Sequence, residues 1–177
     1  MPRHAEGRRP RPDPNATVCV LKVALTGDRR TWRRIAIRSD QTLDDLHAII
    51  FTAFDRFDEH LYSFHRQPLY ARHGTGDHSD NVEYTSPVMI EDVQPMDRHD
   101  VRDASETVIG TLDLQPRGKL YYLFDFGDSW WHDLTVEQIG LPLEARRRYP
   151  FIMEKRGVSP PQYQPLEDRE SGETNET

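Results

Sequence analysis

Apolar and polar residues alternate along two neighbouring segments near the start of the chain. The alternation runs from Thr17 to Thr26, stops at Gly27-Asp28, and resumes from Thr31 to Arg38. Alternation of this kind is typical of strands that bury one face, and the short polar loop indicates a β-hairpin. The positions predicted to face the core are Cys19, Leu21, Val23, Leu25, Ile35 and Ile37. The other face of the second strand carries Trp32, Arg34, Ala36 and Arg38.

The next segment, from Leu43 to Phe57, has helical spacing. Its apolar stripe consists of Leu43, Leu46, Ile49, Ile50, Ala53, Phe54 and Phe57. Ser39 or Asp40 can cap the start of this helix, and two aspartates in its first turn suit the helix dipole. We expect the helix to lie across the sheet. His47 sits beside the stripe, which favours a packing or hydrogen-bonding role over a ligand role.

The rest of the chain shows weaker patterns. His60 to Arg66 predicts a third strand, on which His60 and His65 point to opposite faces and so do not share a metal ion. Residues 67–105 lose periodicity and predict a long irregular excursion, with an edge strand or cover segment within 82–90. Val108 to Leu114 predicts a short helical turn or strand. Leu141 to Tyr149 predicts a short helix.

The densest aromatic run lies between Lys119 and Glu137, and it predicts a second hairpin. With Gly127-Asp128 as a two-residue loop, Asp125 pairs with Trp130 and Leu123 pairs with His132. One face then carries Tyr121, Leu123, Asp125, Trp130, His132, Leu134 and Val136. This face is the more aliphatic of the two, so we expect it to pack on the helix.

A candidate polar cluster lies within this hairpin, made of Asp125, Asp128, His132 and Trp130. A buried aspartate needs a partner, because desolvating an unpaired carboxylate costs several kcal/mol. The predicted register brings Asp125 and His132 within reach of each other. We favour a polar latch that fixes the register, and the alternatives are an acid–base pair or half of a metal site.

The other face of the hairpin carries an aromatic patch. Its members are Tyr122, Phe124, Phe126 and Trp131. A patch of this size is rarely left in water without a purpose. We expect other parts of the chain to cover it, and the alternative is that a partner does.

Composition limits the classes of protein to which the chain can belong. The 177 residues predict one domain, and a net charge of -7 argues against general affinity for phosphates. The single cysteine, Cys19, excludes an intramolecular disulfide and a cysteine-based zinc site. No apolar run approaches the length of a membrane span, so we expect a cytoplasmic protein with no membrane contact. No cofactor and no metal are expected.

Domain organisation follows from the same composition. Residues 1–16 hold four arginines among prolines and predict a disordered basic arm, which could touch nucleic acid. Residues 17–163 predict a single domain. Residues 164–177 predict a disordered acidic tail.

Four segments together resemble a known family. They are Trp32-Arg33-Arg34-Ile35, the helix start Thr42 to His47, the strand His60 to Phe64, and Tyr122-x-x-Asp125-Phe126-Gly127-Asp128-Ser129-Trp130-x-His132. In this order they resemble the plasmid pRiA4b open-reading-frame-three-like family, also labelled mobile-element passenger proteins and in part resolvase-like. Many members continue with Pro-Pro-Glu-Asp-x-x-Gly-Gly, where this chain has only Ser159-Pro160-Pro161-Gln162-Tyr163. The resemblance implies a mobile-element context and no established activity.

The sequence therefore predicts an α+β fold, a β-grasp-like mixed sheet with one main helix packed across it. A ferredoxin-like split sheet is the alternative. For function we favour a non-enzymatic interaction or accessory module with a protein or nucleic acid partner. The alternatives are a nucleic-acid-binding protein and a metal-dependent or acid–base enzyme centred on Asp125, Asp128 and His132. The candidate binding residues are Trp32, Arg33, Arg34, Arg38, Tyr122, Phe124, Phe126 and Trp131.

Overall fold

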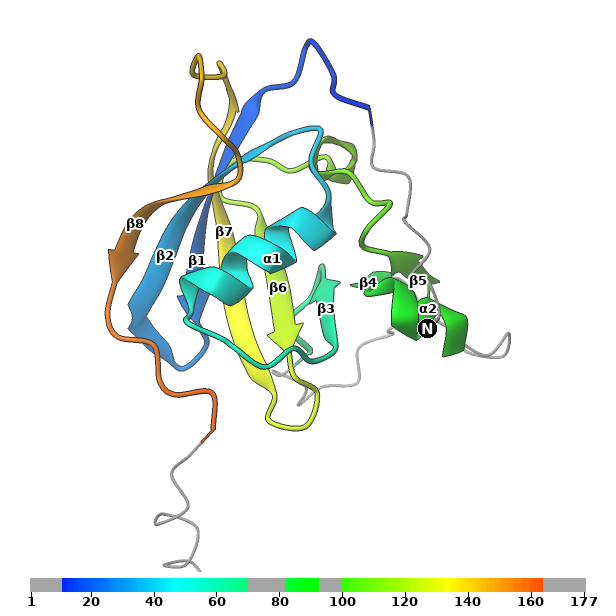
Figure 1. The fold of residues 1–177 in the computed structure, drawn as a ribbon, viewed down its shortest axis with the longest axis vertical. Helices are drawn as coiled ribbons and strands as arrows, with labels where there is room; N and C mark the ends of the chain where they lie inside the picture. The colour runs from blue at the N-terminus through cyan, green and yellow to red at the C-terminus, as the bar shows by residue number, and fades with distance from the viewer. Residues whose placement is uncertain (1–10, 70–81, 93–99, 164–177) are drawn as a thin grey trace, which may run out of the picture.

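The computed structural model describes residues 11–69, 82–92 and 100–163, which form one eight-stranded sheet with helices around it (Figure 1). Neighbouring strands are antiparallel except for the parallel pair β4–β5. The strand order across the sheet is β5 (Asp100–Asp103), β4 (Val82–Thr85), β3 (Tyr62–His65), β6 (Lys119–Phe124), β7 (Trp130–Leu141), β1 (Val18–Leu25), β2 (Asp28–Arg38) and β8 (Phe151–Arg156). The helical segments are α1 (Leu43–Ala53), α2 (Pro87–Asp92) and the 3-10 helix η2 (Ile109–Leu112).

This architecture confirms a mixed α+β fold with one main helix across a mixed sheet. The predicted order of two strands, a helix, a strand and a later strand pair is also confirmed. The narrower β-grasp-like and ferredoxin-like arrangements stay predictions. The segment 67–105 contains β4, α2 and β5, and its residues 70–81 and 93–99 lie outside the described residues. Turns, not the predicted helix, follow β7 after Leu141, and the edge strand β8 was not predicted.

The opening hairpin buries the face that its alternation indicates. Leu21, Val23, Ile35 and Ile37 are fully buried in the main core. Burying each such side chain contributes about 1.5–3 kcal/mol, so this stripe alone fixes which face of β1 and β2 points inward. The opposite face is partly covered as well. Val18, Val20 and Ala36 form a second small core with Leu141, Tyr149 and Phe151.

The helix α1 starts at the predicted residue but has a different cap and an earlier end. Thr42, not Ser39 or Asp40, is its N-cap, and a capping box joins Thr42 to Asp45. The prediction of the cap was wrong because Ser39 and Asp40 have other partners, the Thr17 amide and the Arg38 side chain. The helix ends at Ala53, and Asp55 takes a positive φ of 56°. This turn leaves Phe57 73% exposed instead of on the buried stripe.

His47 has the packing role that its position predicts. Its Nδ1 lies 2.7 Å from the Tyr122 hydroxyl, and its ring stacks on Tyr62 with centroids 3.8 Å apart. Burial lowers the pKa of His47 to about 4, so the ring is neutral at physiological pH. The prediction of a packing or hydrogen-bonding role is therefore confirmed.

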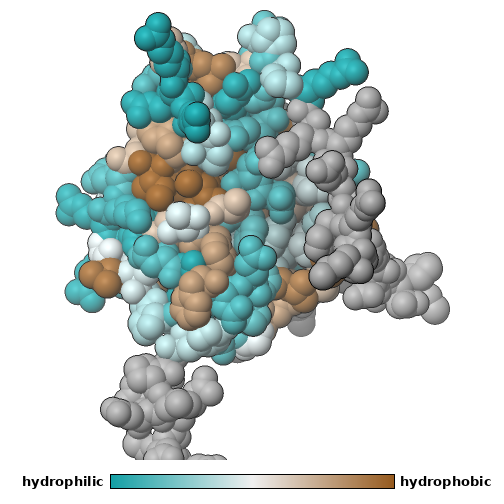
Figure 2. Space-filling view, in the orientation of Figure 1, coloured by the Kyte–Doolittle hydropathy of each residue, from teal (hydrophilic) through white to brown (hydrophobic). Residues whose placement is uncertain are grey.

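The two ends of the sheet carry different loops. In Figure 1, the described start of the chain and η2 lie at the upper end, near the start of α1. The β6–β7 loop lies at the lower end, beside the connection from α1 to β3 and the segment that follows β8. Figure 2 shows that the viewed face is mostly hydrophilic, with separate patches of hydrophobic residues. The loop at this lower end belongs to the segment from Tyr122 to His132, the last of the four segments that resemble the known family.

Candidate functional site

The hairpin at the centre of the motif turns through five residues, not two. Phe124 pairs with Trp130, Leu123 with Trp131, and Tyr122 with His132. Asp125 to Ser129 therefore form the loop, and the predicted register was wrong by one residue.

Asp125 causes this longer loop. Its backbone has a φ of 57°, a conformation that aspartate tolerates better than most residues. Its Oδ1 accepts hydrogen bonds from the amides of Gly127 at 3.0 Å and Asp128 at 3.3 Å. Its carbonyl accepts a further hydrogen bond from the Ser129 amide at 2.7 Å. The aspartate side chain thus satisfies loop amides locally, which makes a wider turn as favourable as continued strand pairing.

The one-residue change exchanges the two faces of β6, because side chains alternate along a strand. Tyr122 and Phe124 are each 1% exposed and lie in the main core beneath α1. The predicted aromatic face is therefore split. Phe126 lies in the loop with 36% exposure, and Trp131 lies on the opposite sheet face beside His65. Tyr122 and Phe124 are covered within the chain, but by α1, so the prediction that the helix packs on the face of Tyr121 and Leu123 was wrong.

The predicted Asp125–His132 latch does not form, because it depended on the wrong register. His132 is buried, with its Nδ1 3.0 Å from the Trp130 carbonyl and its ring edge-on to Phe54. Burial, together with the positive charge of Arg56, lowers the pKa of His132 to about 3. His132 is therefore a neutral core residue, while Asp125 and Asp128 lie in the loop.

Asp125 instead faces His60. The Nε2 atom of His60 lies 3.5 Å from Asp125 Oδ2 and 3.6 Å from Asp58 Oδ2. The same nitrogen lies 2.8 Å from the Tyr163 hydroxyl, which donates to Asp58 at 2.5 Å. Donation to Asp58 raises the pKa of Tyr163 to about 12. Three distant segments thus meet at one polar cluster at the mouth of the β6–β7 loop.

Exposed apolar side chains surround this cluster. Phe57 is 73% exposed and lies edge-on to Tyr163 with centroids 5.9 Å apart, while Leu61, Phe126 and Tyr163 are each about one-third exposed. The Leu61 carbonyl accepts the Asp125 amide at 2.9 Å, which holds it against the loop. We name this region the signature surface. It consists of Phe57, Leu61, Phe126 and Tyr163 with the carboxylates Asp58, Glu59, Asp125 and Asp128.

The segment 157–163, which follows β8, holds this surface together. Gln162 is buried, its Oε1 accepts the amides of Phe57 and Asp58, and its Nε2 donates to the Asp58 carbonyl. Arg56 donates to the Pro160 carbonyl at 3.0 Å and lies over the Trp130 ring. Sequence reasoning missed Asp58, His60, Arg56 and Gln162 as site residues. The available signals were the strand that begins at His60 and the Pro-Pro-Gln-Tyr run, both within the family resemblance.

The candidate basic strand is neutralised within the fold. Arg33 is 2% exposed and faces the core, so it is not an exposed binding residue. Arg34 forms ion pairs with Glu137 and Glu154, and Arg38 pairs with Asp40 at 2.7 Å. Lys22 and Arg34 each form a cation–π contact with the Trp32 ring. Each of these four residues has an intramolecular partner.

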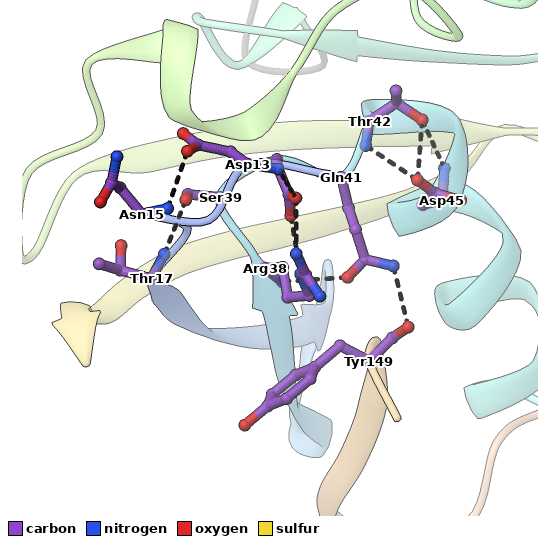
Figure 3. Close-up of polar contacts among 10 residues, drawn as sticks. Asp13, Asn15, Thr17, Arg38, Ser39, Gln41, Thr42, Asp45 and Tyr149 are labelled. Carbon is purple, nitrogen blue, oxygen red and sulfur yellow. Dashed lines mark hydrogen bonds and ion pairs between the residues drawn. The ribbon is translucent and has the colours of Figure 1, made fainter. Parts of the chain in front are cut away.

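A cavity of about 630 Å³ lies at the other end of the sheet, between the described start of the chain and η2. Hydrogen bonds along its rim join Asp13 to Asp40 and Thr17 to Ser39, and Arg38 pairs with Asp40 (Figure 3). Cys19 lies in its wall, and burial raises the pKa of this thiol to about 11. A thiol of this kind is unreactive at neutral pH.

Metal centres and membrane spans are both absent from the described part of the chain. Among residues 11–69, 82–92 and 100–163, no group of three or more His, Cys, Asp or Glu side chains is placed to hold a metal ion. Within the same ranges, no helix is long and apolar enough to cross a membrane.

Comparisons with known proteins place the chain. A comparison with curated proteins gave no match. The fold is similar to the crystal structure of MM3350, a protein of unknown function from Methanosarcina mazei Go1, with a TM-score of 0.65 and 23% sequence identity. That match covers 83% of this chain and 74% of the other. The model of the family described as plasmid pRiA4b ORF-3-like protein matches residues 17–163, so this chain belongs to the plasmid pRiA4b ORF-3-like family.

Proposed function

We propose that this protein is a non-enzymatic interaction module that binds a protein partner on the signature surface. The observation that carries the proposal is the exposure of Phe57 against Tyr163, with Leu61 and Phe126 exposed on the two backbone segments that meet at Asp125. Exposed apolar clusters rimmed by polar groups are typical of protein interfaces, which are enriched in aromatic side chains.

The other two hypotheses have less support. The acid–base hypothesis needs Asp125, Asp128 and His132 to converge, whereas His132 is enclosed in the core and its pKa is lowered by burial. The nucleic-acid hypothesis needs free arginines, whereas Arg34 and Arg38 are paired with carboxylates. Binding of a protein partner requires neither converging acid–base residues nor free arginines. An accessory role in a mobile element fits the family resemblance.

Peptide selection tests the proposal and does not require the natural partner to be identified first. A random peptide library displayed on phage is selected against the full chain, and recovered peptides are measured against variants by fluorescence anisotropy. We expect Phe57→Ser with Phe126→Ser to weaken binding at least about tenfold, because central aromatic contacts dominate interface energies. Val88→Ser is the matched control, since Val88 is 60% exposed on α2 away from this surface.

The same experiment can refute the proposal. Peptides that bind the double variant as tightly as the wild type would show that the signature surface is not the interaction site. Failure to recover any binding peptide would also count against it. Thermal melts of both variants accompany the assay, and we expect the melting temperatures to stay close to that of the wild type because both rings are exposed.

A further inference from the structure

The signature surface pairs aromatic rings with an excess of negative charge. Phe57 is the most exposed aromatic side chain among the described residues. The side chain of Asp58, the next residue, is 57% exposed. Glu59 and Asp128 are exposed as well, and Asp125 lies at the base of the loop.

The described residues supply little positive charge to these carboxylates. His60 is the ion-pair partner that the described residues offer to Asp58 and Asp125, and both contacts are about 3.5 Å long. Arg56 is close in sequence, but it is only 6% exposed and its Nη1 is bonded to the Pro160 carbonyl. Asp58, Glu59 and Asp128 therefore face solvent beside exposed rings, while Asp125 is buried, and the described residues place no guanidinium or ammonium group against the exposed three.

We propose that the partner presents an arginine-bearing apolar segment to the signature surface, with a guanidinium over Phe57 that donates to Asp58 and Asp128. This inference rests on the proposed function and names the chemistry of the partner. A cation over an aromatic face is attracted to the negative face of the ring, and hydrogen bonds between charged groups are stronger than those between neutral groups. The negative rim favours a basic peptide and repels the phosphates of a nucleic acid.

Arginine suits this surface better than lysine for two physical reasons. Its guanidinium is planar, so it stacks on a ring while its edge donates to a carboxylate in the same plane. It is also less strongly hydrated than an ammonium group, so moving it onto an apolar surface costs less. Asp58 already accepts the Tyr163 hydroxyl, which fixes one carboxylate oxygen and leaves the other available to the ligand.

Three synthetic peptides test this inference on the full chain. The first is acetyl-Gly-Leu-Arg-Phe-Arg-Leu-Gly-amide, and the others replace both arginines with lysine or with neutral citrulline. We expect titration calorimetry at low salt to give the tightest binding for the arginine peptide. The lysine peptide should bind at least about threefold more weakly and the citrulline peptide at least about tenfold.

Protein variants locate the effect. Asp58→Asn with Asp128→Asn should weaken the arginine peptide about tenfold and leave the citrulline peptide unchanged. Asp58→Asn keeps an acceptor for Tyr163, so the local fold is retained. Asp100→Asn is the control, because Asp100 is an exposed aspartate on the far edge strand β5, where it pairs with Arg102.

The outcomes separate this inference from the proposed function. Equal binding of all three peptides, or an unchanged affinity in the double aspartate variant, would overturn the arginine assignment. If library-selected peptides still require Phe57 and Phe126 in that case, the signature surface is an interaction site, but its partner does not bind through an arginine. If those peptides are indifferent to Phe57 and Phe126, the surface itself is refuted.

Discussion

Two consecutive arginines on β2 have opposite environments. Arg33 is buried, and its guanidinium donates to the carbonyls of Ala53 at 2.7 Å and Arg156 at 2.6 Å and to the Ser159 hydroxyl at 2.7 Å. The Ala53 carbonyl lies at the C-terminal end of α1, where the helix dipole favours a cation, and α1 has no basic residue in its own last turn. Arg33 therefore joins the sheet, the helix and the segment after β8.

We expect Arg33→Lys to lower the free energy of unfolding by about 2–4 kcal/mol, because an ammonium cannot reach all of these acceptors and leaves some unpaired. Arg34→Lys is the matched control, because its partners Glu137 and Glu154 accept either cation at a half-exposed site. The control should cost less than about 1 kcal/mol. Urea denaturation measures the free energy of unfolding of both variants. Equal decreases would show that the contacts of Arg33 stabilise the fold no more than those of Arg34.

Two buried histidines predict how stability depends on pH. The unfolded chain protonates both near pH 6.5, whereas the folded protein keeps His47 neutral to about pH 4 and His132 neutral to about pH 3. Below pH 6.5 the unfolded state therefore binds more protons, so the free energy of unfolding falls as the pH falls. Each histidine contributes a slope of about 1.4 kcal/mol per pH unit.

Urea titrations between pH 6 and pH 5 should detect this slope. His132→Phe should reduce the slope by about 1.4 kcal/mol per pH unit, because one titrating group is removed from a site that phenylalanine also fits. His60→Gln is the control at an exposed position, since the side chain of His60 is 37% exposed. An unchanged slope in the His132 variant would mean that His132 is not held neutral by the fold.

At the scale of elements, the segment 157–163 depends on its first residue. Gly157 has a φ of 71°, and a Cβ there would lie 2.7 Å from Thr31 Cα and 2.9 Å from Arg30 O. We expect Gly157→Ala to lower the free energy of unfolding by about 3 kcal/mol, about 1 from the left-handed backbone and about 2 from displaced backbone. Gly140→Ala is the matched control, because Gly140 has a φ of 72° and open space around it. Thermal melts that show equal losses would contradict this packing argument.

The same scale shows what could be predicted from the sequence. Strong periodicity identified β1, β2 and α1, since a buried face recurs along each of these elements, whereas β3 was identified from a weaker pattern and is buried on both faces. The register of β6 and β7 was missed because the Asp125 side chain bonds to loop amides, which no hydrophobic pattern records. Strand β8 was missed because it is an edge strand that buries little. The contacts of Arg33 with Arg156 and Gly157 span more than 120 residues, beyond any local signal.

At the scale of the whole molecule, charge separates protein binding from nucleic acid binding. The net charge is -7, and the partly buried arginines of β2, Arg34 and Arg38, are paired with Glu137, Glu154 and Asp40. Affinity for a nucleic acid duplex depends on cations that are free to replace counterions along the phosphates. The exposed arginines of β2 are Arg29 and Arg30, two adjacent residues at the start of the strand, and Arg30 lies 3.7 Å from Asp28.

We therefore expect no binding of a 20-base-pair duplex tighter than about 100 μM in 50 mM salt, measured by fluorescence anisotropy with the full chain. Glu137→Gln with Glu154→Gln removes both partners of Arg34 and changes the net charge from -7 to -5, which is -7 plus 2. If Glu137 and Glu154 are what keeps Arg34 from binding phosphates, the double variant should gain weak binding to the duplex that disappears by 200 mM salt.

Tight, salt-sensitive binding of the duplex by the wild type would contradict the expectation that this protein does not bind nucleic acid. Loss of that binding in Arg8→Gln with Arg9→Gln would assign the contact to the N-terminal arm. Binding that is absent from the double variant as well would contradict the expectation that the paired carboxylates are what prevents Arg34 from contacting phosphates.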